Sequence, residues 1–169
     1  MPIPLFVCWA NCCRSVMAKY LYEHLFPGAR ALSAGIAVGE EINDRACAML
    51  QQWGIDASGH QPRQLDAELC HQADAIFLMG PEYLCRLLED YRKELAAKAY
   101  LFADPFTMPQ SFADGTYLVY DPSFEGRSIP ELVEEFSWFP ERVVEIHAAL
   151  RSGTPKLIPA VRYLDLLSF

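Results

Sequence analysis

Residues 6–26 read FVCWANCCRSVMAKYLYEHLF, and this stretch decides which fold the chain adopts. It begins inside IPLFVC at residues 3–8, a short apolar run that suits a buried strand. It ends in RSVMAKYLYEHLF at residues 14–26, which has the length of a helix and is stopped by the Pro-Gly pair at 27–28. Three cysteines and an arginine lie within this connection or at its two ends. The stretch therefore predicts a strand, a tight loop and a helix in direct succession.

The rest of the chain continues this alternation. Further strands are expected at residues 29–36, 73–79 and 99–102, and further helices at 43–54, 67–71, 81–95 and 130–150. Because alternating strands and helices join through right-handed crossovers, the pattern predicts an α/β fold. We expect a single three-layer domain over residues 1–150, with a four-stranded parallel sheet and helices on both faces. Residues 151–169 are a C-terminal extension to which the sequence assigns no structure.

Three residues are expected to shape the helix ends. Asn43 is a candidate N-cap for the second helix, and Asp66 for the short helix that follows it. Pro140 lies inside the last helical segment and is expected to kink or divide it, because proline cannot donate a backbone hydrogen bond.

Composition limits the functions open to the chain. Its 169 residues carry a net charge of −8 and show no basic run, which argues against nucleic-acid binding. The N-terminus lacks a charged leader and no apolar stretch reaches bilayer length, so we expect a cytoplasmic protein without membrane insertion. With an ample core, its six cysteines are expected to be reduced. Cysteines 47, 70 and 85 have the pattern of small buried hydrophobes.

The cysteine-rich loop lies at the carboxyl end of the first expected strand, the edge where open α/β sheets bind ligands. Cys8 ends that strand, and Arg14 opens the helix after five intervening residues. A loop of this length can turn its backbone N–H groups around one tetrahedral anion, and the helix N-terminus adds partial positive charge. The guanidinium of Arg14 offers a planar fork for two phosphate oxygens. The sequence therefore predicts a phosphate-binding loop after the first strand.

The same positive field favours the thiolate of Cys8, which is the nucleophilic form of cysteine. The hydroxyl of Ser15 is a candidate partner for that sulfur, and Asn11 tolerates the left-handed conformation that a tight loop can require. A zinc site is a weaker alternative, because CWANCC lacks the usual pair spacing and no nearby histidines complete it. Core packing alone suits Cys12 but leaves Arg14 unexplained.

VCWANCCRS at residues 7–15 resembles the signature of low-molecular-weight protein tyrosine phosphatases, V-C-x-[G/A]-N-x-C-R-S. The similarity continues in order through LSAG, HQPRQL, IFLM and DPSFEG, and covers roughly residues 3 to 150. Ala10 and the short loop after LSAG look like bacterial members. The resemblance implies hydrolysis of phosphotyrosine and aryl phosphates without a cofactor or metal. It also implies a tyrosine-phosphorylated protein as partner, with a bacterial tyrosine kinase among the candidates.

The resemblance also implies a role for each matching residue. Cys8 becomes the nucleophile that forms a phosphocysteine, and Arg14 becomes the phosphate clamp. Cys13 matches the second family cysteine, which can trap an oxidised nucleophile as a reversible disulfide, so redox sensitivity is expected. Trp9 and Phe124 are candidate walls for a phenyl ring. The residues expected to bind substrate are Trp9, Ala10, Asn11, Cys12, Cys13, Ser15 and Phe124.

Displacing a phenolate requires a proton donor, and two Asp-Pro pairs offer one. Asp121 lies in a late loop before the last long helix, as the family's acid does, whereas Asp104 directly follows the fourth strand. We therefore assign the general acid to Asp121 and read Asp104 as a turn residue. His60 and His71 are assigned no metal-binding or acid–base role and are expected to be solvated or hydrogen-bonded.

Several positions differ from the common family pattern, notably Cys12, Val16, Gly80 and Ser123.

Two other functions use the same fold. An arsenate reductase needs a relay of two further cysteines near the third strand, where Met79 stands and only Cys85 lies nearby. A phosphotyrosine-binding module without turnover would have lost the nucleophile, the clamp or the acid, and the sequence retains a candidate for each.

Overall fold

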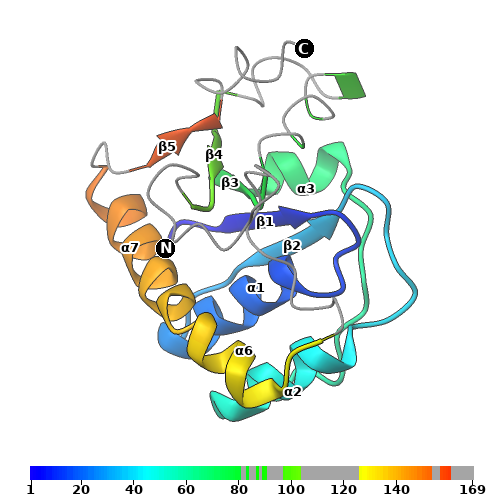
Figure 1. Ribbon diagram of the computed structural model, residues 1–169. Coiled ribbons are helices and arrows are strands. Elements are labelled where there is room, and N and C mark those ends of the chain that lie inside the picture. Colours follow the sequence, from blue (N-terminus) through cyan, green and yellow to red (C-terminus); the bar gives the residue numbers. More distant parts are fainter. Residues whose placement is uncertain are drawn as a thin grey trace, which may run out of the picture.

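Strands and helices alternate along the chain, as the sequence predicts (Figure 1). The computed structural model describes residues 1–80, 83, 87, 89–90, 97–103, 126–153 and 157–160. The elements in order are β1 (Pro4–Cys8), α1 (Arg14–Leu25), β2 (Leu32–Gly35), α2 (Asp44–Gln52), α3 (Ala67–Gln72), β3 (Ala75–Leu78), β4 (Ala99–Leu101), α6 (Ile129–Glu135), α7 (Trp138–Ser152) and β5 (Ile158–Pro159). The predicted strands at 3–8, 29–36, 73–79 and 99–102 are all present, each shorter than predicted, and β2 has half the predicted length.

The sheet has the strand order β2-β1-β3-β4-β5. The first four strands are parallel, which confirms the predicted α/β fold. The fifth was not predicted: β5 lies in the C-terminal extension and pairs antiparallel with β4. A two-residue strand has no hydrophobic period to detect, so only its partner reveals it. The domain boundary expected at 150/151 falls inside α7, and the division into domain and extension stays a prediction.

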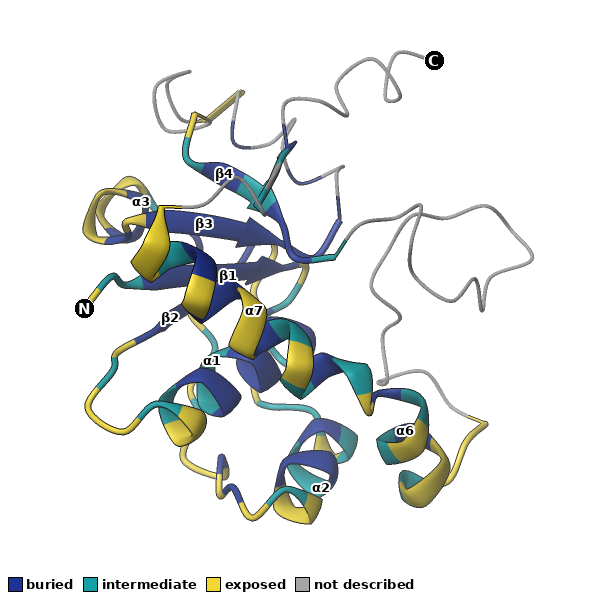
Figure 2. Ribbon diagram, turned by 90° about the vertical axis from the view of Figure 1, so that its left-hand side faces the viewer, coloured by how far each residue is buried: buried dark blue, intermediate teal, exposed yellow. Residues whose placement is uncertain are grey.

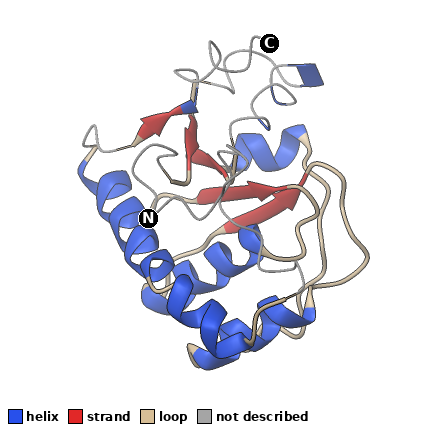
Figure 3. Cartoon of the chain, in the orientation of Figure 1, coloured by secondary structure: helices blue, strands red, loops and turns tan. Residues whose placement is uncertain are grey.

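The helix ends follow local chemistry. The Asn43 side chain accepts hydrogen bonds from two backbone N–H groups of α2, and Asp66 accepts one from Leu69 at 2.7 Å, which confirms both predicted N-caps. The last helical segment is divided into α6 and α7 (Figure 3). The break lies at Phe136 and Ser137, and Pro140 falls in the first turn of α7. A proline clashes with the carbonyl four residues earlier, here that of Phe136, so the division precedes the proline.

The core lies between the sheet and the helices (Figure 2). Strands β1 and β3 are buried along their whole length, and α1 packs on β1 and against α7. The side chains of Phe6, Tyr22, Phe77 and Phe102 meet there with ring centroids 5.7–6.2 Å from Phe6. Figure 1 shows α3 across the sheet from α1. Within the described residues, no helix has the length and apolarity to cross a membrane.

The parallel strands end at one edge. Cys8 at the end of β1 is level with Gly35 of β2, and Val7 is level with Leu78 of β3. The loop that follows Cys8 therefore lies at the carboxyl edge of the sheet, between its two neighbouring strands.

Candidate active site

The connection between β1 and α1, residues 9–13, is a tight loop whose turn is made at Asn11. Asn11 has a φ of 55°, and among the described residues it is the only non-glycine residue with positive φ. Asparagine enters this left-handed region at lower cost than most residues. The predicted backbone role of Asn11 is therefore confirmed.

The carbonyl groups of this loop point outward, toward neighbouring segments. Four carbonyls accept backbone hydrogen bonds: Cys8 from Ile36 at 3.2 Å, Trp9 from Ala37 at 2.9 Å, Ala10 from Gly39 at 2.9 Å, and Cys12 from Asn43 at 2.8 Å. The Asn11 carbonyl meets the His60 ring, as described below. In a trans peptide the following N–H points opposite to the C=O, so the N–H groups of the loop face its centre. This arrangement suits a tetrahedral anion bound inside the loop.

A chain of hydrogen bonds leads to the sulfur of Cys8. Asn11 Nδ2 donates to Ser15 Oγ at 2.9 Å, and Ser15 Oγ lies 3.0 Å from Cys8 Sγ. Because the serine oxygen accepts a hydrogen bond from Asn11, its own hydroxyl hydrogen is available to the sulfur. All three side chains are buried, with Cys8 only 2% exposed. A hydroxyl that can donate to the sulfur is the contact that a thiolate nucleophile would require.

Contacts to His60 and Arg63 hold Asn11 in place. Its Oδ1 accepts the backbone N–H of Arg63 at 2.8 Å, and its carbonyl oxygen lies 3.1 Å from His60 Nε2. His60 packs edge-on against the ring of Tyr20. The prediction that His60 is hydrogen-bonded is confirmed, and His71 is exposed. The sequence did not reveal that the partner of His60 is the loop itself; the only available signal was the HQPRQL motif.

Gly35 lies directly against the loop. Its N–H donates to the Arg63 carbonyl at 2.9 Å, and its carbonyl accepts from Leu65 at 2.8 Å. A Cβ at this position would lie 2.8 Å from backbone atoms of Trp9, Ala10 and Asn11. Only glycine allows the strand and the loop to approach this closely. The close approach of the loop therefore explains the glycine of the LSAG motif, and the sequence alone did not indicate this steric requirement.

Arg14 opens α1 and is 4% exposed. Its Nη2 lies 3.4 Å from the hydroxyl oxygen of Tyr83, which is buried and follows β3. Tyr83 was not predicted as part of the site. The family resemblance implies an acidic residue where Gly80 stands, with Glu82 as the alternative polar support, and Glu82 lies outside the described residues. Tyr83 provides a polar contact to the guanidinium from the same segment, and such a contact fixes the orientation of the arginine fork.

The remaining loop side chains point in different directions. Trp9 is 55% exposed and presents its indole to solvent beside Cys8. The Cys12 thiol donates to the Ala10 carbonyl at 3.3 Å, so it lies on the outer side of the loop, near Gly39. Cys13 is buried in the core. The sequence had not shown in which direction the Cys12 side chain points.

Four residues of the predicted site or its alternatives lie outside the described residues. They are the candidate acid Asp121, the ring wall Phe124, the alternative acid Asp104 and the possible relay cysteine Cys85.

Two cysteines outside the loop have raised pKa values. Burial raises the pKa of Cys70 to about 11, with Lys98 acting in the opposite direction, and burial also raises the pKa of Cys47. Both are therefore poor nucleophiles at neutral pH. In the part of the chain that the structure describes, no three His, Cys, Asp or Glu side chains gather as a metal-binding group.

Comparisons with known proteins identify the family of the chain. Residues 4–149 match the family model described as low molecular weight phosphotyrosine protein phosphatase. The chain belongs to this family. The "Low molecular weight protein-tyrosine-phosphatase Ptp" of Acinetobacter johnsonii is 33% identical over 127 residues, which cover 68% of this chain and 87% of that protein. The resemblance seen in the sequence is thereby confirmed.

The family contains more than one kind of phosphatase. A "Protein-arginine-phosphatase" of Geobacillus stearothermophilus is 33% identical over 118 residues, covering 62% of this chain and 79% of that protein. The solved "YwlE arginine phosphatase from Geobacillus stearothermophilus" superposes with a TM-score of 0.70 at 25% identity, covering 90% of this chain and 95% of that structure. The chain is a phosphatase of this family, with relatives that act on different phosphorylated residues.

Proposed function

We propose that this phosphatase hydrolyses phosphotyrosine in proteins, and other aryl phosphates, through a phosphocysteine intermediate. The observation that carries the proposal is the hydrogen-bond chain Asn11–Ser15–Cys8, which places a stabilised sulfur at the base of an anion-binding loop. The remaining roles are the phosphate clamp at Arg14 and the general acid at Asp121.

The reaction has two displacements at phosphorus. In the first, the Cys8 thiolate forms an S–P bond as the P–O bond to the tyrosine breaks, and the leaving oxygen takes the proton of Asp121. In the second, Asp121 accepts a proton from water, whose oxygen attacks phosphorus and releases the Cys8 thiolate and inorganic phosphate. The loop N–H groups and Arg14 stabilise the equatorial oxygens in both transition states.

Phosphoarginine is the second candidate substrate, because an arginine phosphatase is among the relatives. The exposed indole of Trp9 suits a phenyl ring by stacking. A guanidinium can stack on the same surface, so Trp9 is compatible with either substrate. We favour phosphotyrosine because the Ptp relative, named a protein-tyrosine-phosphatase, matches a larger share of the chain.

The two remaining alternatives have less support. An arsenate reductase relay through Cys70 would use a thiol whose pKa burial raises to about 11, which disfavours the thiolate. A binding module without turnover would not require the serine that supports the Cys8 sulfur.

The proposed partner is a tyrosine-phosphorylated protein, with a bacterial tyrosine kinase among the candidates. We propose that the protein acts on it in the cytoplasm.

The proposal is tested with matched peptides that carry phosphotyrosine or phosphoarginine. Wild type is expected to release phosphate from the phosphotyrosine peptide with the higher kcat/KM, and Cys8→Ser is expected to release none while still binding inorganic phosphate. Preference for the phosphoarginine peptide would transfer the assignment to the second candidate. Full activity of Cys8→Ser would rule out the phosphocysteine mechanism.

Asp121→Asn tests the acid separately. Loss of the proton donor is expected to lower kcat/KM by roughly 10²- to 10⁴-fold for phenyl phosphate, whose leaving group needs a proton, and much less for p-nitrophenyl phosphate. If Asp104→Asn shows this leaving-group dependence and Asp121→Asn does not, the acid is Asp104.

A further inference from the structure

The segment that follows β2, residues 36–39, lies along the outer side of the phosphate-binding loop; we call it the rim segment. The N–H of Ala37 donates to the Trp9 carbonyl, and that of Gly39 donates to the Ala10 carbonyl, both at 2.9 Å. Because a trans peptide points its C=O and N–H in opposite directions, the N–H groups on the other side of these two peptide planes face the centre of the loop. The position of the rim segment therefore sets the direction of donors that face a bound anion.

The side chain of Gln64 holds the rim segment in place. Its Nε2 donates to the Ile36 carbonyl at 2.7 Å, and its Oε1 accepts the N–H of Val38 at 3.3 Å. One amide group thus binds the backbone on both sides of Ala37. The backbone of Gln64 is fixed as well, because it forms a parallel bridge with Gly35 at the end of β2. Gln64 therefore fastens the rim segment to the sheet.

These contacts form a series of hydrogen bonds through two peptide groups. The carbonyl of the Ile36–Ala37 peptide accepts from Gln64 Nε2. The N–H of that peptide donates to the carbonyl of the Trp9–Ala10 peptide, whose own N–H faces the centre of the loop. Hydrogen bonds in such a series polarise one another, and each fixes the orientation of the next group. The amide of Gln64 thereby acts on a donor of the anion site without touching the anion.

We propose that Gln64 is a positioning residue of this phosphatase: by holding the Ile36–Ala37 peptide, it keeps the Ala10 N–H directed at the phosphoryl group. The inference rests on the proposed function, in which the loop binds the phosphoryl oxygens. Gln64 is exposed and water competes for its hydrogen bonds, so its contribution to the stability of the fold is small. Loss of its amide is therefore expected to change the site more than the fold.

Gln64→Met keeps the length of the side chain and removes both hydrogen bonds. Removing an oxyanion donor outright costs about 10²- to 10³-fold, and a donor that is only less well directed costs part of that, so kcat/KM is expected to fall roughly tenfold. The loss is expected to be equal for phenyl phosphate and p-nitrophenyl phosphate, because the loop binds the non-bridging oxygens of both. The inhibition constant for vanadate, which resembles the transition state, is expected to rise by the same factor.

Gln64→Glu separates the two ends of the amide. The carboxylate keeps an acceptor for the Val38 N–H but cannot donate to the Ile36 carbonyl, so the series of hydrogen bonds is broken at its outer end. Losses like those of Gln64→Met are expected. Wild-type values in Gln64→Glu would overturn the inference, since they would show that the bond to Ile36 is not needed.

Gln61 provides the matched control. It is the same residue type three positions earlier and is exposed, and in the described part of the chain no hydrogen bond holds its side chain. Gln61→Met is expected to have wild-type kcat/KM and the wild-type inhibition constant for vanadate. A rise of that constant equal to the rise in Gln64→Met would overturn the inference.

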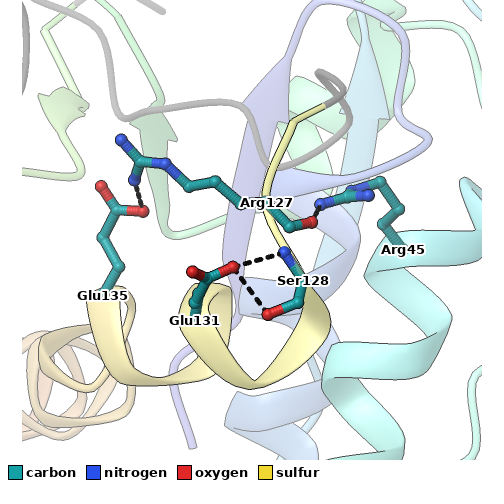
Figure 4. Close-up of polar contacts among 5 residues, drawn as sticks. All are labelled: Arg45, Arg127, Ser128, Glu131 and Glu135. Carbon is teal, nitrogen blue, oxygen red and sulfur yellow. Dashed lines mark hydrogen bonds and ion pairs between the residues drawn. The ribbon is translucent and has the colours of Figure 1, made fainter.

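A second control removes an exposed side-chain contact from another part of the fold (Figure 4). On α6 the Glu131 carboxylate accepts hydrogen bonds from the N–H and Oγ of Ser128, at 2.7 Å each, and nearby Arg45 donates to the Arg127 carbonyl. None of these bonds between described residues reaches the phosphate-binding loop. Glu131→Met is expected to lower the midpoint of urea unfolding slightly and to leave the vanadate constant unchanged. A rise as large as that in Gln64→Met would contradict a specific role of Gln64.

The inhibition constant distinguishes positioning of the site from simple support of the fold. Partial unfolding lowers the concentration of active enzyme and hence the apparent kcat, whereas the molecules that remain folded keep the same affinity for vanadate. An unchanged vanadate constant in Gln64→Met would overturn the inference, whether or not kcat/KM falls.

Phosphate binding to Cys8→Ser, measured by titration calorimetry, separates this inference from the proposed function. Binding needs no turnover, so adding Gln64→Met to Cys8→Ser is expected to weaken phosphate binding severalfold whichever phosphorylated residue the enzyme hydrolyses. Equal affinity with and without Gln64→Met would overturn the inference and leave the proposed function standing. Weaker binding, together with no hydrolysis of the phosphotyrosine peptide by wild type, would support the role of Gln64 and overturn the proposed function.

Discussion

The three thiols of the loop have three different surroundings, although they lie within six residues. Cys8 is buried beside the hydroxyl of Ser15, Cys12 bonds to a carbonyl on the outer side of the loop, and Cys13 is buried in the core. Reactivity follows these surroundings rather than exposure alone, since peroxide attacks the thiolate. Cys8 is therefore expected to be the most oxidisable cysteine of the loop.

Mild peroxide is expected to convert Cys8 to a sulfenic acid, which the Cys13 thiol then attacks to form a disulfide with release of water. The outward position of Cys12 disfavours it as the attacking thiol. Activity is expected to return fully with dithiothreitol in wild type and Cys12→Ala, and only in part in Cys13→Ala, where Cys8 oxidises further. Peptide mapping of the oxidised protein identifies the pair. Full recovery of Cys13→Ala together with poor recovery of Cys12→Ala would make Cys12 the resolving thiol.

Among the secondary-structure elements, β2 has the tightest relation to the site. Its last residue, Gly35, is in backbone contact with the loop, while β1 carries Cys8, the proposed nucleophile, at its own carboxyl end. The loop is thus held between a strand that cannot carry a side chain at that point and Asn43, the N-cap of α2. Its shape depends on packing between elements as well as on its own residues.

Gly35→Ala is expected to displace the loop, because the added Cβ would lie 2.8 Å from three backbone atoms. A shift of about 1 Å can reduce kcat/KM by roughly 10²-fold, and overpacking typically costs about 1–3 kcal/mol of stability. Steady-state kinetics and urea unfolding measure the two effects. Gly59→Ala is the control, since a Cβ there meets no atom within 4 Å. Wild-type kinetics in Gly35→Ala would show that the loop is not held by this contact.

Two imidazoles link distant parts of the fold. His147 of α7 shares a 2.9 Å hydrogen bond with the Tyr22 hydroxyl of α1 and stacks on Phe26, and His60 bonds to the phosphate-binding loop. Burial lowers the pKa of both histidines. The cations Lys19 and Arg151 act in the same direction, and the hydrogen bond to Asn11 partly offsets the effect at His60. Both rings are therefore favoured in the neutral form in the folded chain.

Stability is accordingly expected to depend on pH. The unfolded chain takes up protons at these histidines near their ordinary pKa of about 6.5, whereas the folded chain does so only at lower pH. The free energy of unfolding should therefore be fully maintained above that value and decrease as pH falls below it. Urea unfolding at pH 7.5 and 5.5 measures the change. His147→Gln is expected to reduce the decrease, and the exposed control His71→Gln to leave it unchanged; an undiminished decrease in His147→Gln would exclude His147 as a contributor.

Much of the fold could be predicted because its signals are local. The strand, loop and helix within residues 3–26, the N-caps at Asn43 and Asp66, and the division of the last helical segment near Pro140 each depend on neighbouring residues. The left-handed turn at Asn11 is also a local feature of the chain. Hydrophobic period, capping chemistry and the geometry of proline act over a few residues, so they are visible without the fold.

The parts that could not be predicted are contacts between residues far apart in the chain. The bond from His60 to Asn11 spans 49 positions, that from Arg14 to Tyr83 spans 69, and that from Arg45 to Arg127 spans 82. The pairing of β5 with β4 and the outward direction of Cys12 belong to the same group. No local pattern encodes them, because each arises only when separate elements pack together. The strand, loop and helix around the cysteines were therefore readable from their residues, whereas the support that holds the loop in shape was decided by the tertiary structure.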